Sequence, residues 1–133
     1  MTVDPGAPWP PVDLPVLDRA ALDTLRDLED DDSPDLMSET AEIFLEDANA
    51  RLVQLEQATA SVDLEAMRRV AHALKGASLV MGARRLAVAC GGLESAARDA
   101  HPDAASVWWA RIAIEYELAG EAIREEMRSG GGR

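Results

Sequence analysis

The sequence predicts an all-α protein, an antiparallel four-helix bundle with a short additional helix at its N-terminal end. Alanine and leucine are abundant while aromatic residues make up 4% of the chain, and this composition favours helices over sheets. Apolar residues recur at spacings of three and four along several segments, and none alternates with period two for long. Four amphipathic helices with short connections can bury their apolar stripes only against one another, which gives a bundle.

The placement of proline and glycine divides the 133 residues into one domain and two tails. Five of the seven prolines lie in residues 1–15, which we interpret as an extended tail. We expect Trp9 in this tail to pack onto the body of the protein. The bundle is expected over residues 16–128 and a flexible tail over residues 129–133, where three glycines follow Ser129.

The first two helices have recognisable starts. Asp18 is the expected N-cap of a short helix that ends near Leu28. Ser33 is the expected N-cap of the second helix, with Pro34 at its first position and an end near Ala60.

The remaining three helices follow closely on one another. Asp63 is expected to cap a third helix that reaches Met81, after which Gly82 provides a left-handed cap. A fourth helix spans roughly residues 83–98, and a fifth begins after His101-Pro102-Asp103. The expected buried stripes are Met37, Ala41, Phe44, Ala48, Leu52 and Leu55, then Met67, Val70, Ala71, Leu74, Ala77, Ser78 and Met81, and in the last helix Trp108, Ile112, Tyr116, Ala119, Ile123 and Met127.

The formal net charge of −12 argues against nucleic acid or an anionic membrane as the partner. The charge is unevenly distributed, because residues 66–93 contain five cations and no carboxylate while the rest holds 8 cations and 25 anions. We interpret this basic segment as a docking site for an acidic partner; the alternative is that its arginines only line solvated helix faces. The docking candidates are Arg68, Arg69, Leu79, Arg84 and Arg85.

Several classes of protein are excluded by what the sequence lacks. A single cysteine, Cys90, excludes an internal disulfide, and we place it in the core. No apolar run is long enough to span a bilayer, so a cytoplasmic protein is expected. We also expect a monomer. No metal-ligand cluster and no glycine-rich nucleotide loop occurs, so we expect no cofactor and no phosphorylation from ATP.

The segment His72-Ala-Leu-Lys-Gly-Ala-Ser78 carries the chemistry. Helical phase places Leu74 on the buried stripe and His72 on the outer side, together with Lys75 and Gly76. Lys75 is the only lysine in the chain, and its compact charge suits a phosphoryl group that arrives and leaves. Gly76 costs about 1 kcal/mol inside a helix relative to alanine, which indicates a need for clearance.

A longer pattern surrounds this segment, namely Ala71-His-Ala-Leu-Lys-Gly-Ala-Ser78, then Gly82-Ala83, Leu86, Cys90 and Leu93-Glu94. This pattern resembles, in its residues and in their spacing, the signature of the histidine-containing phosphotransfer (HPt) domains of two-component phosphorelays. Upstream segments fit as well, so the resemblance covers roughly residues 17–127. The chain departs from a regular helix at Gly91-Gly92, and we expect Gly91 to widen the groove beside His72.

The resemblance implies that His72 accepts a phosphoryl group from an aspartyl phosphate on a receiver domain and passes it to another receiver aspartate. Receivers of response regulators or hybrid histidine kinases are then the partners, and they supply the Mg²⁺. Neutral imidazole is a competent nucleophile near neutral pH. Since the turn at Gly82 returns the fourth helix along the third, Glu94 is expected to approach His72 and fix its tautomer; the alternative is a solvated glutamate.

The sequence is also compatible with two other functions. One is a helical bundle that binds a receiver or kinase domain as a regulator without carrying phosphate, in which case binding survives the loss of His72. The other is a purely structural bundle. The charge asymmetry and the helical Gly76 weigh against the structural bundle.

Overall fold

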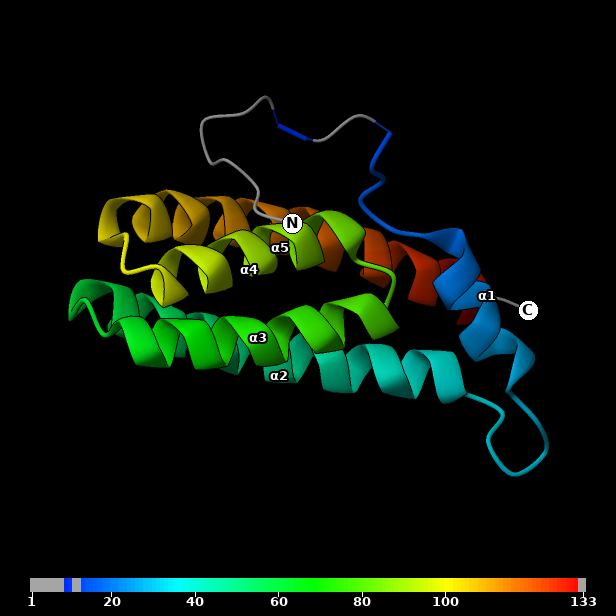
Figure 1. The fold of residues 1–133 in the computed structure, drawn as a ribbon. Coiled ribbons are helices and arrows are strands. Elements are labelled where there is room, and N and C mark those ends of the chain that lie inside the picture. Colours follow the sequence, from blue (N-terminus) through cyan, green and yellow to red (C-terminus); the bar gives the residue numbers. More distant parts are fainter. Residues whose placement is uncertain (1–8, 11–12, 132–133) are drawn as a thin grey trace.

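The computed structural model describes residues 9–10 and 13–131, and all regular structure in this part of the chain is helical. The helices are α1 (Arg19–Asp27), α2 (Leu36–Ala60), α3 (Leu64–Val80), α4 (Arg84–Arg98) and α5 (Pro102–Gly131). Helices α2 to α5 form an antiparallel bundle in which each packs on the next and α5 closes back onto α2 (Figure 1). The predicted fold class, a four-helix bundle with an extra N-terminal helix, is confirmed.

Helix α1 lies at the end of the bundle where α3 turns into α4 (Figure 1). The backbone N–H of Asp18 donates to the carbonyl of Gly82 at 2.7 Å, which joins the start of α1 to that turn. On α1, Arg26 forms an ion pair with Glu126 near the end of α5 at 3.3 Å. The side chain of Asp18 accepts from the N–H of Ala20, so the predicted N-cap of this helix is confirmed.

The predicted stripes face the core of the bundle. Every residue of the three stripes is buried except Leu52, Ala77 and Met127, which are half-buried at the margins. Cys90 is fully buried, as expected, and burial raises the pKa of its thiol. The helical period alone therefore identified the faces that hold the bundle together.

Helix α2 begins later than the sequence predicted, so Ser33 is not its N-cap. The helix starts at Leu36. The reason is local, because the Asp30 carboxylate accepts from the N–H groups of Asp32 and Ser33 at 2.9 and 2.8 Å and closes a turn there. The N–H of Met37 donates instead to a carboxylate oxygen of Glu29, the residue just before this turn, at 3.2 Å.

The turn between α3 and α4 requires a glycine for two reasons. Gly82 has a φ of +73°, a conformation that residues with a side chain rarely adopt. A Cβ at this position would also lie 2.7 Å from the carbonyl oxygen of Asp18. The predicted left-handed cap is therefore confirmed, and the same glycine leaves room for the start of α1.

Trp9 packs onto α5, as expected. Its indole N–H donates to Glu115 at 2.7 Å, and its ring meets the edge of Trp108 with centroids 5.7 Å apart. The guanidinium of Arg111 lies 4.7 Å from the centre of the Trp9 ring. The rest of the expected tail, at residues 1–8 and 11–12, lies outside the described residues.

Helix α5 continues to Gly131, past the expected end of the bundle at residue 128. Residues 132–133 of the expected C-terminal tail lie outside the described residues. None of the described helices combines the length and apolar character needed to cross a membrane.

Candidate functional site

The site is built by the α3–α4 hairpin. His72 lies ten residues before Gly82 and Glu94 twelve residues after it, so an antiparallel return brings the two to the same level. Asp63 fixes the register of α3 at its start, where its carboxylate accepts from the N–H of Ala66 at 3.1 Å. Leu74 and Leu93, which neighbour the two site residues, are both fully buried and hold the helices together.

Glu94 contacts both of the residues that the sequence singled out. One of its carboxylate oxygens, Oε2, lies 2.7 Å from His72 Nδ1, and the other, Oε1, accepts from Lys75 Nζ at 2.7 Å. Because an ionised carboxylate can only accept, the proton of the neutral imidazole resides on Nδ1. The second ring nitrogen, Nε2, then carries the lone pair.

The ionised form of Glu94 is favoured by these contacts. Burial by itself raises the pKa of Glu94, since 13% of its side chain is exposed, but the hydrogen bonds and charges of Lys75 and His72 outweigh burial. The net effect is a pKa below the usual range of a carboxyl group. Glu94 is therefore a fixed anion beneath an imidazole that is 65% exposed.

Lys75 is anchored rather than free. Its ammonium is held by Glu94, and 33% of its side chain is exposed. The sequence placed Lys75 beside His72 but did not reveal that one carboxylate would hold both. The charge pattern could have indicated this contact, because Glu94 is the first carboxylate after residues 66–93, which contain cations and no carboxylate.

The surface beyond His72 is open. A Cβ built on Gly76 would meet nothing within 4 Å, so the fold itself does not require this glycine. Leu79, one turn further along α3, is 53% exposed. A Cβ on Gly91 would lie 3.7 Å from Lys75 Cδ, an ordinary contact, so Gly91 lies beside the site without being needed for clearance from the fold.

The four arginines of the basic segment differ in their surroundings. Arg68 pairs with Glu65 on its own helix at 2.6 Å, and Arg84 lies 3.6 Å from Asp18. Arg85 on α4 reaches α5, where its Nη2 donates to Glu115 at 2.9 Å. Arg69 is exposed and forms no ion pair or hydrogen bond within the described part of the chain. Three of these four arginines are therefore paired with carboxylates of this chain.

Glu115 is a buried acidic residue that the sequence analysis missed. It is 2% exposed and lies on α5, and its Oε2 accepts from both Arg85 and Trp9. Glu115 belongs to no motif, and it is not part of the predicted apolar stripe of this helix, which contains the next residue, Tyr116. It anchors Arg85 and the described part of the N-terminal segment to the bundle.

Comparison with solved structures shows that other proteins share this fold. Histidine-containing phosphotransfer protein B from Pseudomonas aeruginosa PAO1 superposes with a TM-score of 0.78 at 30% identity, over 86% of this chain and 96% of that one. A histidine-containing phosphotransfer protein from Medicago truncatula superposes with a TM-score of 0.72 at 24% identity, over 87% of this chain and 84% of that one, and shows that the fold is shared.

Sequence comparison gives two curated relatives and a family. Histidine-containing phosphotransfer protein 2 of Arabidopsis thaliana is 36% identical over 69 residues, 50% of this chain and 44% of that protein. Multistep phosphorelay regulator 1 of Schizosaccharomyces pombe is 27% identical over 78 residues, 59% of this chain and 26% of that protein. The chain thus spans less than half the length of either relative. The model of the Hpt domain matches residues 39–127, which is more than half of the chain. This chain therefore belongs to the Hpt domain family.

Proposed function

We propose that this chain is a phosphorelay intermediate that carries a phosphoryl group on Nε2 of His72. The observation that carries the proposal is the contact of His72 Nδ1 with Glu94 at 2.7 Å, which directs the other ring nitrogen away from the bundle. A nucleophile that must meet a second protein has to be exposed, and 65% of this side chain is. The family and its relatives support the same role.

The transfer step follows from the tautomer. The lone pair on Nε2 attacks the phosphorus of a receiver aspartyl phosphate in line, the bond from phosphorus to the aspartyl oxygen breaks, and the aspartate leaves as a carboxylate. The ring keeps its Nδ1 proton and becomes positively charged, and the adjacent Glu94 anion stabilises it. Onward transfer to a second receiver aspartate reverses these bond changes.

Lys75 and Gly76 have separate parts in this proposal. The Lys75 ammonium, held by Glu94 beside the imidazole, offsets the charge of the incoming phosphoryl group. Gly76 leaves open space in which a receiver surface can reach His72. Mg²⁺ belongs to the acidic pocket of the receiver, and this chain acts as a monomeric carrier that needs no nucleotide.

Phosphoryl transfer from a receiver tests the proposal. A receiver domain from the same genome, charged with a small-molecule phosphodonor and Mg²⁺, is expected to label the chain with an acid-labile, base-stable phosphate. His72→Gln is expected to abolish labelling. His101→Gln is the matched control, since His101 is the other histidine of the chain and lies in an exposed turn. Labelling that persists in His72→Gln contradicts the proposal.

A further inference from the structure

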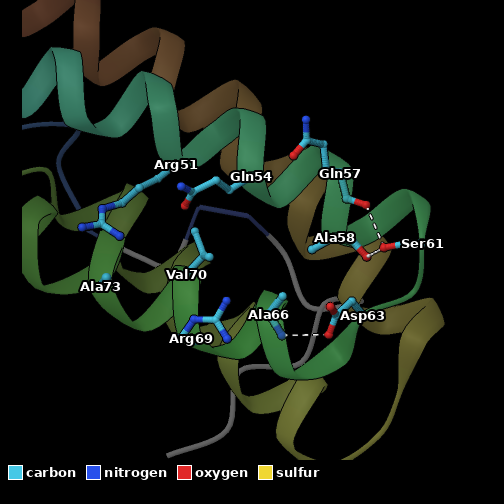
Figure 2. A pocket seen from close by; sticks show the side chains of 10 residues that line it. All are labelled: Arg51, Gln54, Gln57, Ala58, Ser61, Asp63, Ala66, Arg69, Val70 and Ala73. Atoms are coloured by element: carbon cyan, nitrogen blue, oxygen red, sulfur yellow. Dashed lines mark hydrogen bonds between the residues drawn. The ribbon is translucent and has the colours of Figure 1, made fainter.

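A cleft of about 520 Å³, lined by polar and apolar side chains, lies between α2 and α3 and reaches the residue next to the proposed phosphoacceptor (Figure 2). Its lining includes Arg51, Gln54 and Gln57 from α2, and Arg69, Val70 and Ala73 from α3. Ala73 directly follows His72 in the chain. His72 itself does not line the cleft, but the cleft reaches the helical turn of α3 that carries it.

The charges of the cleft favour an anion. Arg69 forms no ion pair among the described residues, whereas Arg68, Arg84 and Arg85 are each matched by a carboxylate of this chain. Across the cleft, Arg51 uses its Nε to bind Asp47 at 2.8 Å. A carboxylate that enters between the two arginines finds one guanidinium that forms no ion pair or hydrogen bond in the described chain, although its charge also acts on Glu65, and a second one nearby.

The only acidic side chain in the lining lies at the far end of the cleft. This is Asp63, whose Oδ1 is already engaged with the N–H of Ala66 at 3.1 Å (Figure 2). Gln54 adds a neutral amide that can donate a hydrogen bond to an anion. In a chain of net charge −12, an arginine that lines a cleft without an ion pair in the described chain fits an acidic contact.

The position of Arg69 on α3 defines how such a contact relates to His72. Arg69 precedes His72 by three residues, which is about 4.5 Å along the helix axis, and lies on the side that faces α2. Lys75, three residues after His72, lies on the other flank of His72, toward α4, where Glu94 holds it. A partner that approaches through the open space at Gly76 can thus reach Arg69 without displacing the His72–Glu94–Lys75 contacts.

We propose that this cleft binds an acidic side chain of the receiver domain that docks over His72, and that Arg69 is its main contact and a determinant of partner choice. The inference rests on the proposed function, since it takes a receiver as the partner. Of the four arginines expected to dock a partner, the proposal retains Arg69 as the main contact. It adds Arg51 and Gln54, which lie outside the basic segment of residues 66–93.

Binding measured without phosphoryl transfer tests the cleft separately from the chemistry. The probe is each receiver domain of the source organism, titrated by calorimetry into the His72→Gln chain, and transfer to the unaltered chain is measured in a separate assay. In the His72→Gln chain, Arg69→Gln is expected to weaken receiver binding about threefold and Arg69→Glu about tenfold. The affinity of both variants should also depend less on salt concentration than that of the chain that retains Arg69. Arg128→Glu, the same charge change at an exposed position near the end of α5, is expected to leave binding unchanged.

A charge exchange identifies the partner group. One exposed Asp or Glu of the receiver, replaced by Lys, is expected to restore binding to Arg69→Glu and to weaken binding to the chain that retains Arg69. Equal affinities of the Arg69→Glu and Arg128→Glu chains would overturn the cleft as a contact, even where phosphoryl transfer to His72 is observed. Absence of binding by every receiver would overturn it as well, whereas normal binding with no transfer to His72 would overturn only the carrier function.

Discussion

The indole of Trp108 lies directly on the backbone of Gly92. A Cβ built on Gly92 would be 2.3 Å from Trp108 Cε2, closer than two unbonded carbon atoms can approach. Trp108 is 1% exposed and is itself covered by Trp9, so it has little freedom to retreat. The absent side chain at Gly92 is what allows α4 and α5 to pack at this distance.

The two adjacent glycines of α4 are therefore expected to respond in opposite ways to alanine. Gly92→Ala forces Trp108 out of place and should lower the free energy of unfolding by about 1–3 kcal/mol. Gly91→Ala meets Lys75 at an ordinary 3.7 Å and should raise it by up to about 1 kcal/mol through helix propensity. Urea unfolding of both variants measures this difference, and equal effects would show that the Trp108 contact does not control packing.

The sequence predicted the helices and most of the core, because the apolar period reports directly which side of a helix is buried. It misassigned the start of α2, since the competing turn at Asp30 depends on which N–H groups a short carboxylate side chain reaches. It also attached importance to Gly91 rather than Gly92. Which of two consecutive glycines faces a tryptophan 16 residues away depends on the packing of α4 on α5, which no local pattern encodes.

In the site, too, residues whose partners are fixed by one hairpin could be predicted and others could not. His72, Lys75 and Glu94 could be selected from spacing because the hairpin geometry is simple. The roles of the arginines could not, since each depends on a carboxylate distant in sequence. Arg85 finds Glu115 thirty residues away on α5, while its neighbour Arg84 lies near Asp18. Charge composition alone treats these two residues as equivalent.

Arg84 and Arg85 are thus expected to differ sharply when replaced by alanine. Arg85→Ala leaves the Glu115 carboxylate, 2% exposed, without its cation, and loss of one partner of a buried pair costs about 3–5 kcal/mol. Arg84→Ala removes an exposed contact with Asp18 at 3.6 Å and should cost less than about 1 kcal/mol. Chemical unfolding measures both. A small effect of Arg85→Ala would mean that Glu115 is accessible to water.

Gly76→Ala is expected to separate stability from function. The added methyl group meets nothing in the fold, so it should raise the free energy of unfolding by about 1 kcal/mol. The same methyl group projects into the space through which a receiver reaches His72, so the rate of transfer should fall. Unfolding and transfer measured on one preparation test both parts. Unchanged transfer in the more stable variant would remove Gly76 from the docking surface.

The pH dependence of Glu94 tests how the site holds its charge. Burial raises the pKa of this carboxyl, but the contacts of Lys75 and His72 lower it to below the ordinary value of 4.5. Because the pKa in the folded state lies below that in the unfolded state, ionised Glu94 stabilises the fold above about pH 4.5, and this stability is lost as the pH falls through the folded value. The unfolding free energies of the unaltered chain and of Glu94→Gln should therefore differ most near neutral pH and converge in acid.

Lys75→Met is expected to raise the pKa of Glu94, because it removes a group that lowers it. Without the ammonium, the stabilising hydrogen bond to Oε1 is lost while burial remains, so the pKa of Glu94 should rise relative to that in the unaltered chain. The ¹³C chemical shift of the Glu94 carboxyl, followed through an acid titration, reports this directly. Arg69→Met, which removes a cation from the other flank of His72, is the control and should leave the midpoint of the Glu94 titration unchanged. Identical midpoints in the Lys75→Met and unaltered chains would show that Lys75 does not hold Glu94 ionised, and the anchored ammonium beside His72 would then have no role in fixing the tautomer that presents Nε2.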